Sequence, residues 1–156
     1  TRVTERGARV GDRPGASMSG EEAVVAEFDA EGFAREWVAA WNARDVEAVV
    51  GHFTEDAQFF SPRAEEVTGS PVVSGRAALR EYWQTATGHL DRLQFTLDHV
   101  VWDGGERLAI VYNSEVGERR RRAVELLVID AASGRARYGE AMYGAELRST
   151  GMARPG

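Results

Sequence analysis

Polar side chains that interrupt otherwise apolar strand patterns are the first candidates for chemistry in this sequence. His99 continues an alternating row that contains Leu93, Phe95 and Leu97. We therefore expect it on the same strand face as these apolar residues. An imidazole titrates near neutral pH and is suited to general acid/base catalysis. The alternative is a hydrogen-bonded histidine in the core or at a dimer interface.

Glu125 is the second candidate, because it interrupts the apolar segment 123–130. A carboxyl group buried there is costly unless it is paired, and burial raises its pKa toward the range useful for proton transfer. Tyr112, in the preceding apolar segment, would then polarise an oxygen of the substrate. The alternative for Glu125 is a salt bridge to an arginine of a neighbouring strand, namely Arg119, Arg121 or Arg137.

A larger set of aromatic and polar side chains is predicted to line an apolar ligand pocket. Its members are Trp37, Trp41, Asp56, Phe60, Ser61, Tyr82, Trp83, Glu140 and Met142. For the tryptophans the alternative is ordinary core packing, as for any aromatic stripe at helical spacing. Asp56 has the alternative of stabilising a turn, and Glu140 that of a salt bridge. Tyr143 and Asn113 are further donors, but Asn113 must point away from its neighbour Tyr112.

The residue types that this sequence lacks restrict the chemistry. It has no cysteine, and all 19 of its basic residues are arginine. Thiol nucleophiles, thiolate metal sites and a lysine Schiff base are therefore excluded. The three histidines show no metal-ligand spacing to one another or to carboxylates, so we expect neither a metal nor another cofactor.

Charge and hydropathy restrict the partners. The formal net charge of −6 argues against nucleic-acid binding, which depends on neutralising phosphates. We interpret the run Arg119–Arg122 as a solvated hairpin edge, with an anion-binding patch as the alternative. No apolar run approaches the ~18 residues that a membrane span needs. No signal-peptide pattern is visible, so the expected location is the cytoplasm.

Helices in the first half of the chain must position several of these candidates. Phe33, Trp37 and Trp41 recur at helical spacing and predict a first helix that ends near Asn42. The following elements are predicted as a short helix over 46–53, a strand over 57–60, a loop over 61–75 and a third helix over 76–86.

From residue 90 onward the apolar period changes from helical to two, which predicts four strands. Turn signals at 103–105, 116–118 and 133–134 divide this segment into an antiparallel meander. Both faces of the central strands are largely apolar. One face can bury the helices, and the other needs a cover, for which we expect the partner of a homodimer.

The composition indicates one domain, which we place at residues 26–148. A chain of 156 residues with 43% apolar residues is long enough for one core and short for two. Residues 1–25 lack periodicity and are predicted to be a disordered leader. Residues 149–156 are predicted to be a flexible tail.

This order of elements, with its particular residues, resembles the nuclear transport factor 2-like superfamily and, within it, the SnoaL-like branch. The matching stretches are FAREWVAAWNARD (33–45), VEAVVGHFTEDAQFFSP (46–62), VVSGRAALREYW (72–83) and ELLVIDAASGRARYGEAMYG (125–144). The resemblance implies an α+β fold in which three N-terminal helices pack in the concave face of a strongly bent, mostly antiparallel sheet, a cone-shaped α+β barrel. It also implies a conical pocket, usually in a homodimer.

Two departures limit the activity that the resemblance implies. Ketosteroid-isomerase-like members carry a carboxylate base immediately before the proline that follows the first strand, where this sequence has Ser61 before Pro62. A serine hydroxyl needs a partner base to take a carbon-bound proton at neutral pH. The limonene-epoxide-hydrolase branch activates water with two aspartates, an arginine, a tyrosine and an asparagine, and no such Asp–Arg–Asp set is matched here.

Two functions remain open. The first is a small-molecule-binding protein with a mostly apolar pocket that acts without a cofactor as an acid/base enzyme of the isomerase, cyclase or dehydratase type on a cyclic or polyketide-like substrate. The second is a non-catalytic ligand-binding or dimerisation module. A pocket of at least ~300 Å³ with two converging polar groups would favour the enzyme. A cavity closed by tryptophans, with Glu125 tied to an arginine, would favour the module.

Overall fold

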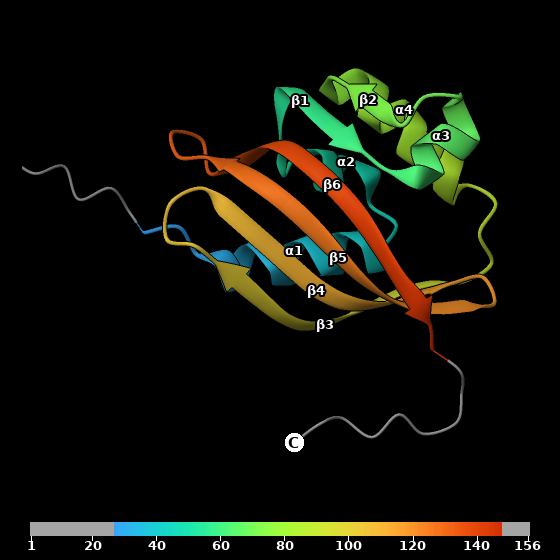
Figure 1. Ribbon diagram of the computed structural model, residues 1–156. Coiled ribbons are helices and arrows are strands. Elements are labelled where there is room, and N and C mark those ends of the chain that lie inside the picture. Colours follow the sequence, from blue (N-terminus) through green and yellow to red (C-terminus); the bar gives the residue numbers. More distant parts are fainter. Residues whose placement is uncertain (1–26, 148–156) are drawn as a thin grey trace, which may run out of the picture.

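The computed structural model describes residues 27–147, which form an α+β fold (Figure 1). The predicted leader at 1–25 and the predicted tail at 149–156 lie outside the described residues. The helices are α1 (Ala30–Asn42), α2 (Val46–Val50), α3 (Pro62–Thr68) and α4 (Arg76–Thr87). The strands are β1 (Phe53–Phe60), β2 (Val72–Ser74), β3 (Leu93–Trp102), β4 (Arg107–Val116), β5 (Arg119–Asp130) and β6 (Arg135–Glu146).

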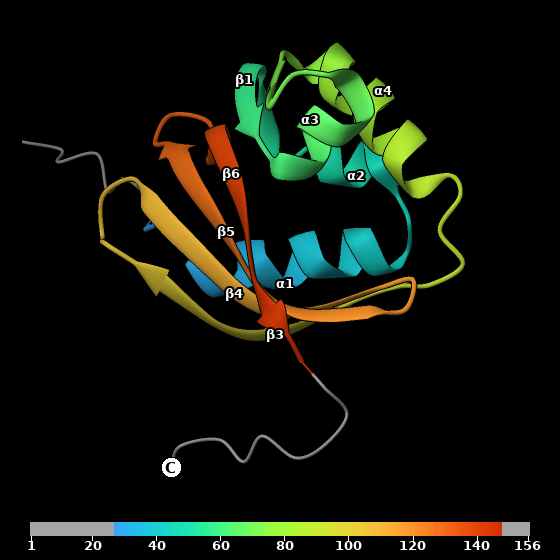
Figure 2. The same ribbon diagram turned by 45° about the vertical axis from the view of Figure 1, so that its right-hand side comes forward.

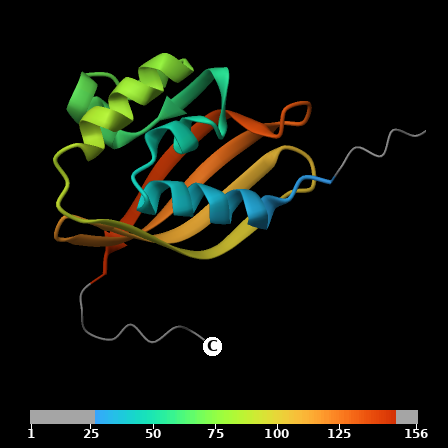
Figure 3. The ribbon, with the colours of Figure 1, turned by 180° about the vertical axis from the view of Figure 1, so that it is seen from behind.

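The six strands form one curved, unclosed sheet in the order β2-β1-β6-β5-β4-β3. Neighbouring strands are antiparallel except for β1 and β6, which are parallel. The long strands β3 to β6 bend together, and α1 lies across their concave side (Figures 2 and 3). The predicted meander and bent sheet are confirmed, and the core lies between the helices and this concave side.

The first two helices begin at side-chain caps. The Asp29 carboxylate accepts a hydrogen bond from the backbone N–H of Gly32 at 2.9 Å, and the Asp45 carboxylate accepts one from Ala48 at 3.0 Å. The apolar stripe of α1 faces the sheet, so that Trp37 is only 1% exposed. The caps and the stripe together fix which side of α1 faces the interior.

The segment 61–75, predicted as a loop, contains helix α3 and strand β2. The Ser61 hydroxyl accepts a hydrogen bond from the backbone N–H of Arg63 at 3.1 Å, Pro62 occupies the first turn, and Gly69 ends the helix with a φ of 79°. These signals begin and end a helix of only seven residues. Because Pro62 and Gly69 were interpreted only as breakers, the prediction of a loop was wrong. The described residues therefore contain four helices instead of three.

Strand β1 begins earlier than predicted. Phe53, which the sequence pattern assigned to the second helix, is fully buried and pairs with Ala136 of β6. Helix α2 ends at Val50 and is followed by Gly51, a residue that weakens helix ends by its conformational freedom. Ala57, the predicted first residue of the strand, lies in its middle.

A β-bulge in β3 changes which residues face the helices. Leu97 pairs with Tyr112 of β4, whereas His99 pairs with Val111, so Asp98 is one extra residue in β3. A shift of one residue turns every following side chain to the opposite face of a strand. The prediction that placed His99 on the face of Leu97 is therefore wrong.

Candidate functional site

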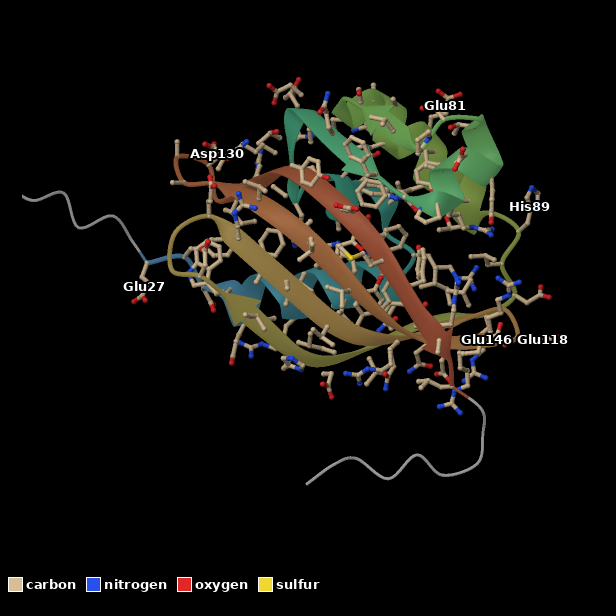
Figure 4. The ribbon with its side chains drawn as sticks, viewed as in Figure 1. Glu27, Glu81, His89, Glu118, Asp130 and Glu146 are labelled. Atoms are coloured by element: carbon tan, nitrogen blue, oxygen red, sulfur yellow. The ribbon has the colours of Figure 1, made fainter. Side chains whose placement is uncertain are left out.

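A cavity of about 540 Å³ lies between the helices and the concave side of the sheet. Its aromatic lining consists of Trp37, Trp41, Phe59, Tyr82, Trp83, Phe95, Tyr112 and Tyr143. The exposed residues Glu118 and Arg119 also line it, so the cavity opens beside the β4–β5 turn. Figure 4 shows Glu118 and Glu146 at this end of the sheet and Asp130 at the opposite end. The volume falls in the range of small-molecule sites.

Glu125 is the buried acidic group of this cavity. It lies on β5 opposite Ala141 of β6 and is only 3% exposed. Burial raises the pKa of Glu125 to about 8, and a hydrogen bond from the Tyr112 hydroxyl opposes part of this increase. The carboxyl group is therefore mostly protonated at neutral pH, yet close enough to its midpoint to donate or accept a proton.

The arginines predicted as alternative partners of Glu125 are engaged elsewhere or lie apart from it. Arg119 is 3.7 Å from Glu146, Arg137 is 2.9 Å from Glu106, and the Arg121 guanidinium lies 4.4 Å from the centre of the Tyr143 ring. Within residues 27–147, Glu125 forms no ion pair. The structure thus disfavours the alternative in which Glu125 forms a salt bridge and takes no part in acid/base chemistry.

Tyr112 lies beside Glu125 and is almost completely buried. Its ring contacts those of Phe95 and Trp37, with centroid distances of 4.7 and 5.2 Å. Burial, followed by the nearby charge of Glu125, raises the pKa of Tyr112 well above its ordinary value. The hydroxyl therefore stays protonated and is available as a hydrogen-bond donor.

Ser61 connects two further tyrosines of the cavity. Its hydroxyl forms hydrogen bonds with Tyr82 and Tyr143, which lower the pKa of both phenols against the larger effect of burial. Burial raises the pKa of Tyr143 to about 12 and also raises that of Tyr82. The charge of Glu125 contributes to both increases, so the two groups of polar residues lie within electrostatic range of each other.

Two indole N–H groups of the cavity wall have no hydrogen-bond partner. They are the Nε1 atoms of Trp37 and Trp41, both of them buried, and no described residue accepts from either. Buried donors in folded proteins are nearly always paired. Both atoms are inaccessible even to water, so they lie within the packed wall and do not contact a ligand in the cavity.

The structure brings together many of the predicted site residues although they come from distant segments. Those that line the cavity are Trp37, Trp41, Ser61, Tyr82, Trp83, Tyr112 and Glu125. Tyr143, predicted as an additional donor, also lines it. Asn113 faces the other way, as predicted from its neighbour, and accepts a hydrogen bond from Arg122 at 3.2 Å.

Three predicted ligand-binding residues lie outside this cavity. Phe59 is 4% exposed and lines the cavity, so strand alternation places Phe60 on the outer side. There its ring lies 5.4 Å from that of Tyr138, whose hydroxyl donates to Glu140 at 3.0 Å. Met142 is 41% exposed. Phe60, Glu140 and Met142 are therefore corrected from pocket residues to outer-face residues.

His99 and Asp56 also lie away from the cavity. The His99 side chain is 54% exposed, and its Nδ1 lies 2.7 Å from Oδ2 of Asp98. Because of the bulge, it cannot act together with Glu125, and its predicted catalytic role is not supported. Asp56 is exposed on β1 and accepts a hydrogen bond from the Thr54 hydroxyl at 3.0 Å. This contact joins two side chains within strand β1, so the structure shows neither the predicted pocket role of Asp56 nor the alternative of stabilising a turn.

Several cavity residues had not been predicted. Phe59 and Phe60 are adjacent, and only the strand's orientation decides which of them faces inward. Arg121 is separated from Glu125 by an even number of positions, so alternation could have placed both on one face. Phe95 belongs to the alternating row of β3 but had not been named as a pocket residue.

Metal binding and membrane crossing receive no support from residues 27–147. No group of three or more His, Cys, Asp or Glu side chains is arranged there to hold a metal ion. No helix of this part of the chain is long and apolar enough to span a membrane.

Comparisons with known proteins agree with this architecture. The family model described as SnoaL-like domain matches residues 34–138. A crystal structure of a SnoaL-like protein from Burkholderia thailandensis is 25% identical, with a TM-score of 0.67 over 74% of this chain and 94% of that one. No curated protein matches the chain.

Two further solved structures are similar in fold. An NTF2-like protein from Burkholderia pseudomallei is 17% identical, with a TM-score of 0.61 over 73% of this chain and 89% of that one. The epoxide hydrolase/cyclase-like enzyme SalBIII, described in pyran ring formation in the polyether salinomycin, is 23% identical, with a TM-score of 0.59 over 77% of this chain and 94% of that one.

Proposed function

This chain belongs to the SnoaL-like domain family of the nuclear transport factor 2-like superfamily, and we propose that its cavity binds a mostly apolar small molecule on which Glu125 and Tyr112 catalyse proton transfer without a cofactor. The observation that carries this proposal is the buried, unpaired Glu125 beside the Tyr112 hydroxyl in a cavity of about 540 Å³. A carboxyl group with a pKa of about 8 is poised for acid/base work near neutral pH.

The proposed step is a proton shuttle next to a carbonyl group of the ligand. The Glu125 carboxylate takes a proton from the carbon beside the carbonyl, and the C–H electron pair becomes the C=C bond of an enolate. Tyr112 donates to the Glu125 carboxylate in the free protein; once Glu125 has taken the proton, the Tyr112 hydroxyl donates instead to the enolate oxygen, where the negative charge develops. Glu125 then returns the proton to the same or another carbon, so that the enzyme is restored and nothing is oxidised or reduced.

The isomerase, cyclase and dehydratase types all include such a proton transfer. A cyclic or polyketide-like substrate fits the aromatic lining of the cavity. The polyether-related enzyme SalBIII, with a similar fold, supports this substrate class by analogy of fold only.

A direct test uses 2-tetralone, an apolar bicyclic ketone, as the probe. We expect the wild-type protein to accelerate exchange of its C1 protons for deuterium, followed by proton NMR. The rate should rise about tenfold per pH unit below the pKa of Glu125, about 8, and level off above it, because the carboxylate is the active form.

Matched variants decide whether Glu125 is responsible. Glu125→Gln should lower the exchange rate by roughly 10²- to 10⁴-fold, the usual size of general acid/base effects. Glu140→Gln, on the outer side of the sheet, should leave it unchanged. An exchange rate no faster than that of buffer, or equal rates in wild type and Glu125→Gln, would contradict the proposal.

The second candidate function is a ligand-binding module without catalysis, and Ser61 favours it. The residue before Pro62 supplies no base here; its hydroxyl instead caps α3 and binds two tyrosines. In this case Glu125→Gln would change ligand affinity, while no proton exchange would exceed the rate in buffer.

We further propose that the outer side of the sheet is covered by a second copy of the chain. Val101, Leu126 and Met142 are 57%, 37% and 41% exposed there, and apolar groups gathered on one face are typical of an interface. Leu126→Arg should convert a dimer to a monomer in sedimentation equilibrium, whereas Val67→Arg, in α3, should not. A monomeric wild-type protein at micromolar concentration would contradict this proposal.

A further inference from the structure

The mouth of the cavity contains an arginine without an anionic partner, and from it we infer that the ligand is an apolar molecule with a carboxylate at one end, held by Arg121. This inference rests on the proposed function and names its substrate class.

The run Arg119–Arg122 divides into arginines with ion-pair partners and one without. Arg120 lies 2.7 Å from Glu115 and Arg122 lies 3.2 Å from Asp98. The exposed Arg119 lies 3.7 Å from Glu146. Among the described residues, Arg121 forms no ion pair and no hydrogen bond, although Glu146 is its cross-strand neighbour on β6.

The Arg121 side chain forms part of the wall of the cavity. It shares the inward face of β5 with Glu125 and is half-buried. Its guanidinium lies 4.4 Å from the centre of the Tyr143 ring, another part of the cavity wall. Stacking of this kind orients the planar guanidinium and leaves its N–H donors for a carboxylate.

The residues between Arg121 and Glu125 leave room for a ligand. The intervening inward position of β5 is Ala123, and Ser114 pairs with Arg121 on β4. Ala141 lies opposite Glu125 on β6. Of these small side chains, Ser114 and Ala141 line the cavity. Arg121 and Glu125 are separated by roughly 14 Å along the strand at about 3.4 Å per residue.

The charges around the cavity are compatible with an anionic group at the mouth. Glu66 is paired with Arg63 at 3.7 Å, and Glu118 is exposed, so that water and salt screen its charge. Glu125 is mostly neutral at pH 7 because burial raises its pKa to about 8. A ligand carboxylate would therefore be attracted by Arg121 and would not be repelled by Glu125, which is mostly uncharged.

The test compares two probes that differ in one charge: 4′-acetylbiphenyl-4-carboxylate and its primary carboxamide. Each carries a ketone at one end of the biphenyl, and only the first carries a negative charge at the other. By isothermal titration calorimetry at pH 7, we expect the wild-type protein to bind the carboxylate at least about tenfold more tightly, since charge-assisted hydrogen bonds are the stronger ones.

Variants of neighbouring arginines provide the control. Arg121→Gln should reduce the preference for the carboxylate to about twofold or less, and Arg121→Lys should retain part of it. Arg120→Gln, which alters an outward-facing arginine already paired with Glu115, should keep the wild-type preference. Circular dichroism would confirm that each variant is folded.

The outcomes separate this inference from the proposed function. Equal affinity of the wild-type protein for the two probes, no binding of either, or a preference that survives in folded Arg121→Gln would overturn the role of Arg121. Glu125-dependent exchange of 2-tetralone would leave the proposed function standing in each of these cases. Conversely, an Arg121-dependent preference without any proton exchange would overturn only the catalytic role of Glu125.

Discussion

The two faces of the long strands carry similar residue types but place them in different environments. On the outer face, Arg122 lies within 3.2 Å of Asp98, which also lies 2.7 Å from His99, and all three remain at least partly accessible to water. On the inner face, Glu125 is buried without any cation within ion-pair distance and is hydrogen-bonded to Tyr112. Arg122 and Glu125, three positions apart on β5, thus differ in solvent exposure and in partner.

This difference shows which acidic groups the fold has made reactive. Solvation or pairing with an arginine keeps the pKa of a carboxyl group low, whereas burial without a nearby cation raises that pKa. In the same way, Arg121 differs from Arg120 and Arg122 because alternation directs it inward, away from the acidic partners of the outer face. The inner face is therefore where we expect chemistry, and the outer face where we expect assembly.

The largest expected contrast concerns two adjacent leucines of β5. Leu127 is 1% exposed on the inner face and Leu126 is 37% exposed on the outer one. Leu127→Ala should lower the free energy of unfolding by about 2–5 kcal/mol, and Leu126→Ala by less than about 1 kcal/mol in the monomer. Urea unfolding over a range of protein concentrations would separate these values from the contribution of self-association. Similar losses in both monomers would contradict the assignment of the faces.

The pH dependence of stability is the next contrast. Because the folded-state pKa of Glu125, about 8, exceeds its ordinary value of 4.5, the native protein holds a proton that the unfolded chain releases between these values. This contribution is complete below about pH 4.5, is lost as pH rises to about 8, and has a slope of at most about 1.4 kcal/mol per pH unit.

Variants of the two faces should separate this effect from other titrations. Glu125→Gln should match the wild-type stability near pH 5 and exceed it by several kcal/mol at pH 9, because the amide stays neutral. Glu140→Gln, on the outer face, should keep the wild-type dependence. Parallel stability curves for wild type and Glu125→Gln in urea would show that Glu125 is not a buried acid.

The smallest expected effect belongs to the outer-face histidine. His99→Ala removes a contact with Asp98 whose histidine side is 54% exposed, and exposed ion pairs contribute about 0–1 kcal/mol. We expect a loss of less than about 1 kcal/mol in urea unfolding and an unchanged rate of 2-tetralone exchange. A large fall in the exchange rate would contradict this expectation and would support a catalytic role for His99.

Strand alternation carried the sequence-based prediction a long way. It identified the meander, the presence of Glu125 on an apolar strand face and the opposed directions of Tyr112 and Asn113, but not which strand face lines the pocket. It failed at His99, because a single bulged residue reverses the alternation. No residue type in β3 indicates from the sequence that a bulge occurs there. It was ambiguous for Phe59 and Phe60, where two adjacent aromatic residues suit either face.

The rest of the site depends on the bending of the sheet and could not be predicted from local patterns. Ser61, Tyr82 and Tyr143 come from the start of α3, from α4 and from β6. Their hydroxyl groups meet only because the curved sheet brings β6 and these helices around one cavity. The pKa of Glu125 has the same origin, since its value depends on burial by these elements.

The most direct test of this account is the pKa of Glu125 itself. Carbon-13 NMR of the glutamate side-chain carboxyl groups, followed from pH 4 to pH 10 and assigned by the signal that disappears in Glu125→Gln, would measure it. We predict a midpoint of about 8. A midpoint near 4.5, the ordinary value for glutamate, would contradict both the buried acid and the proton transfer proposed for it.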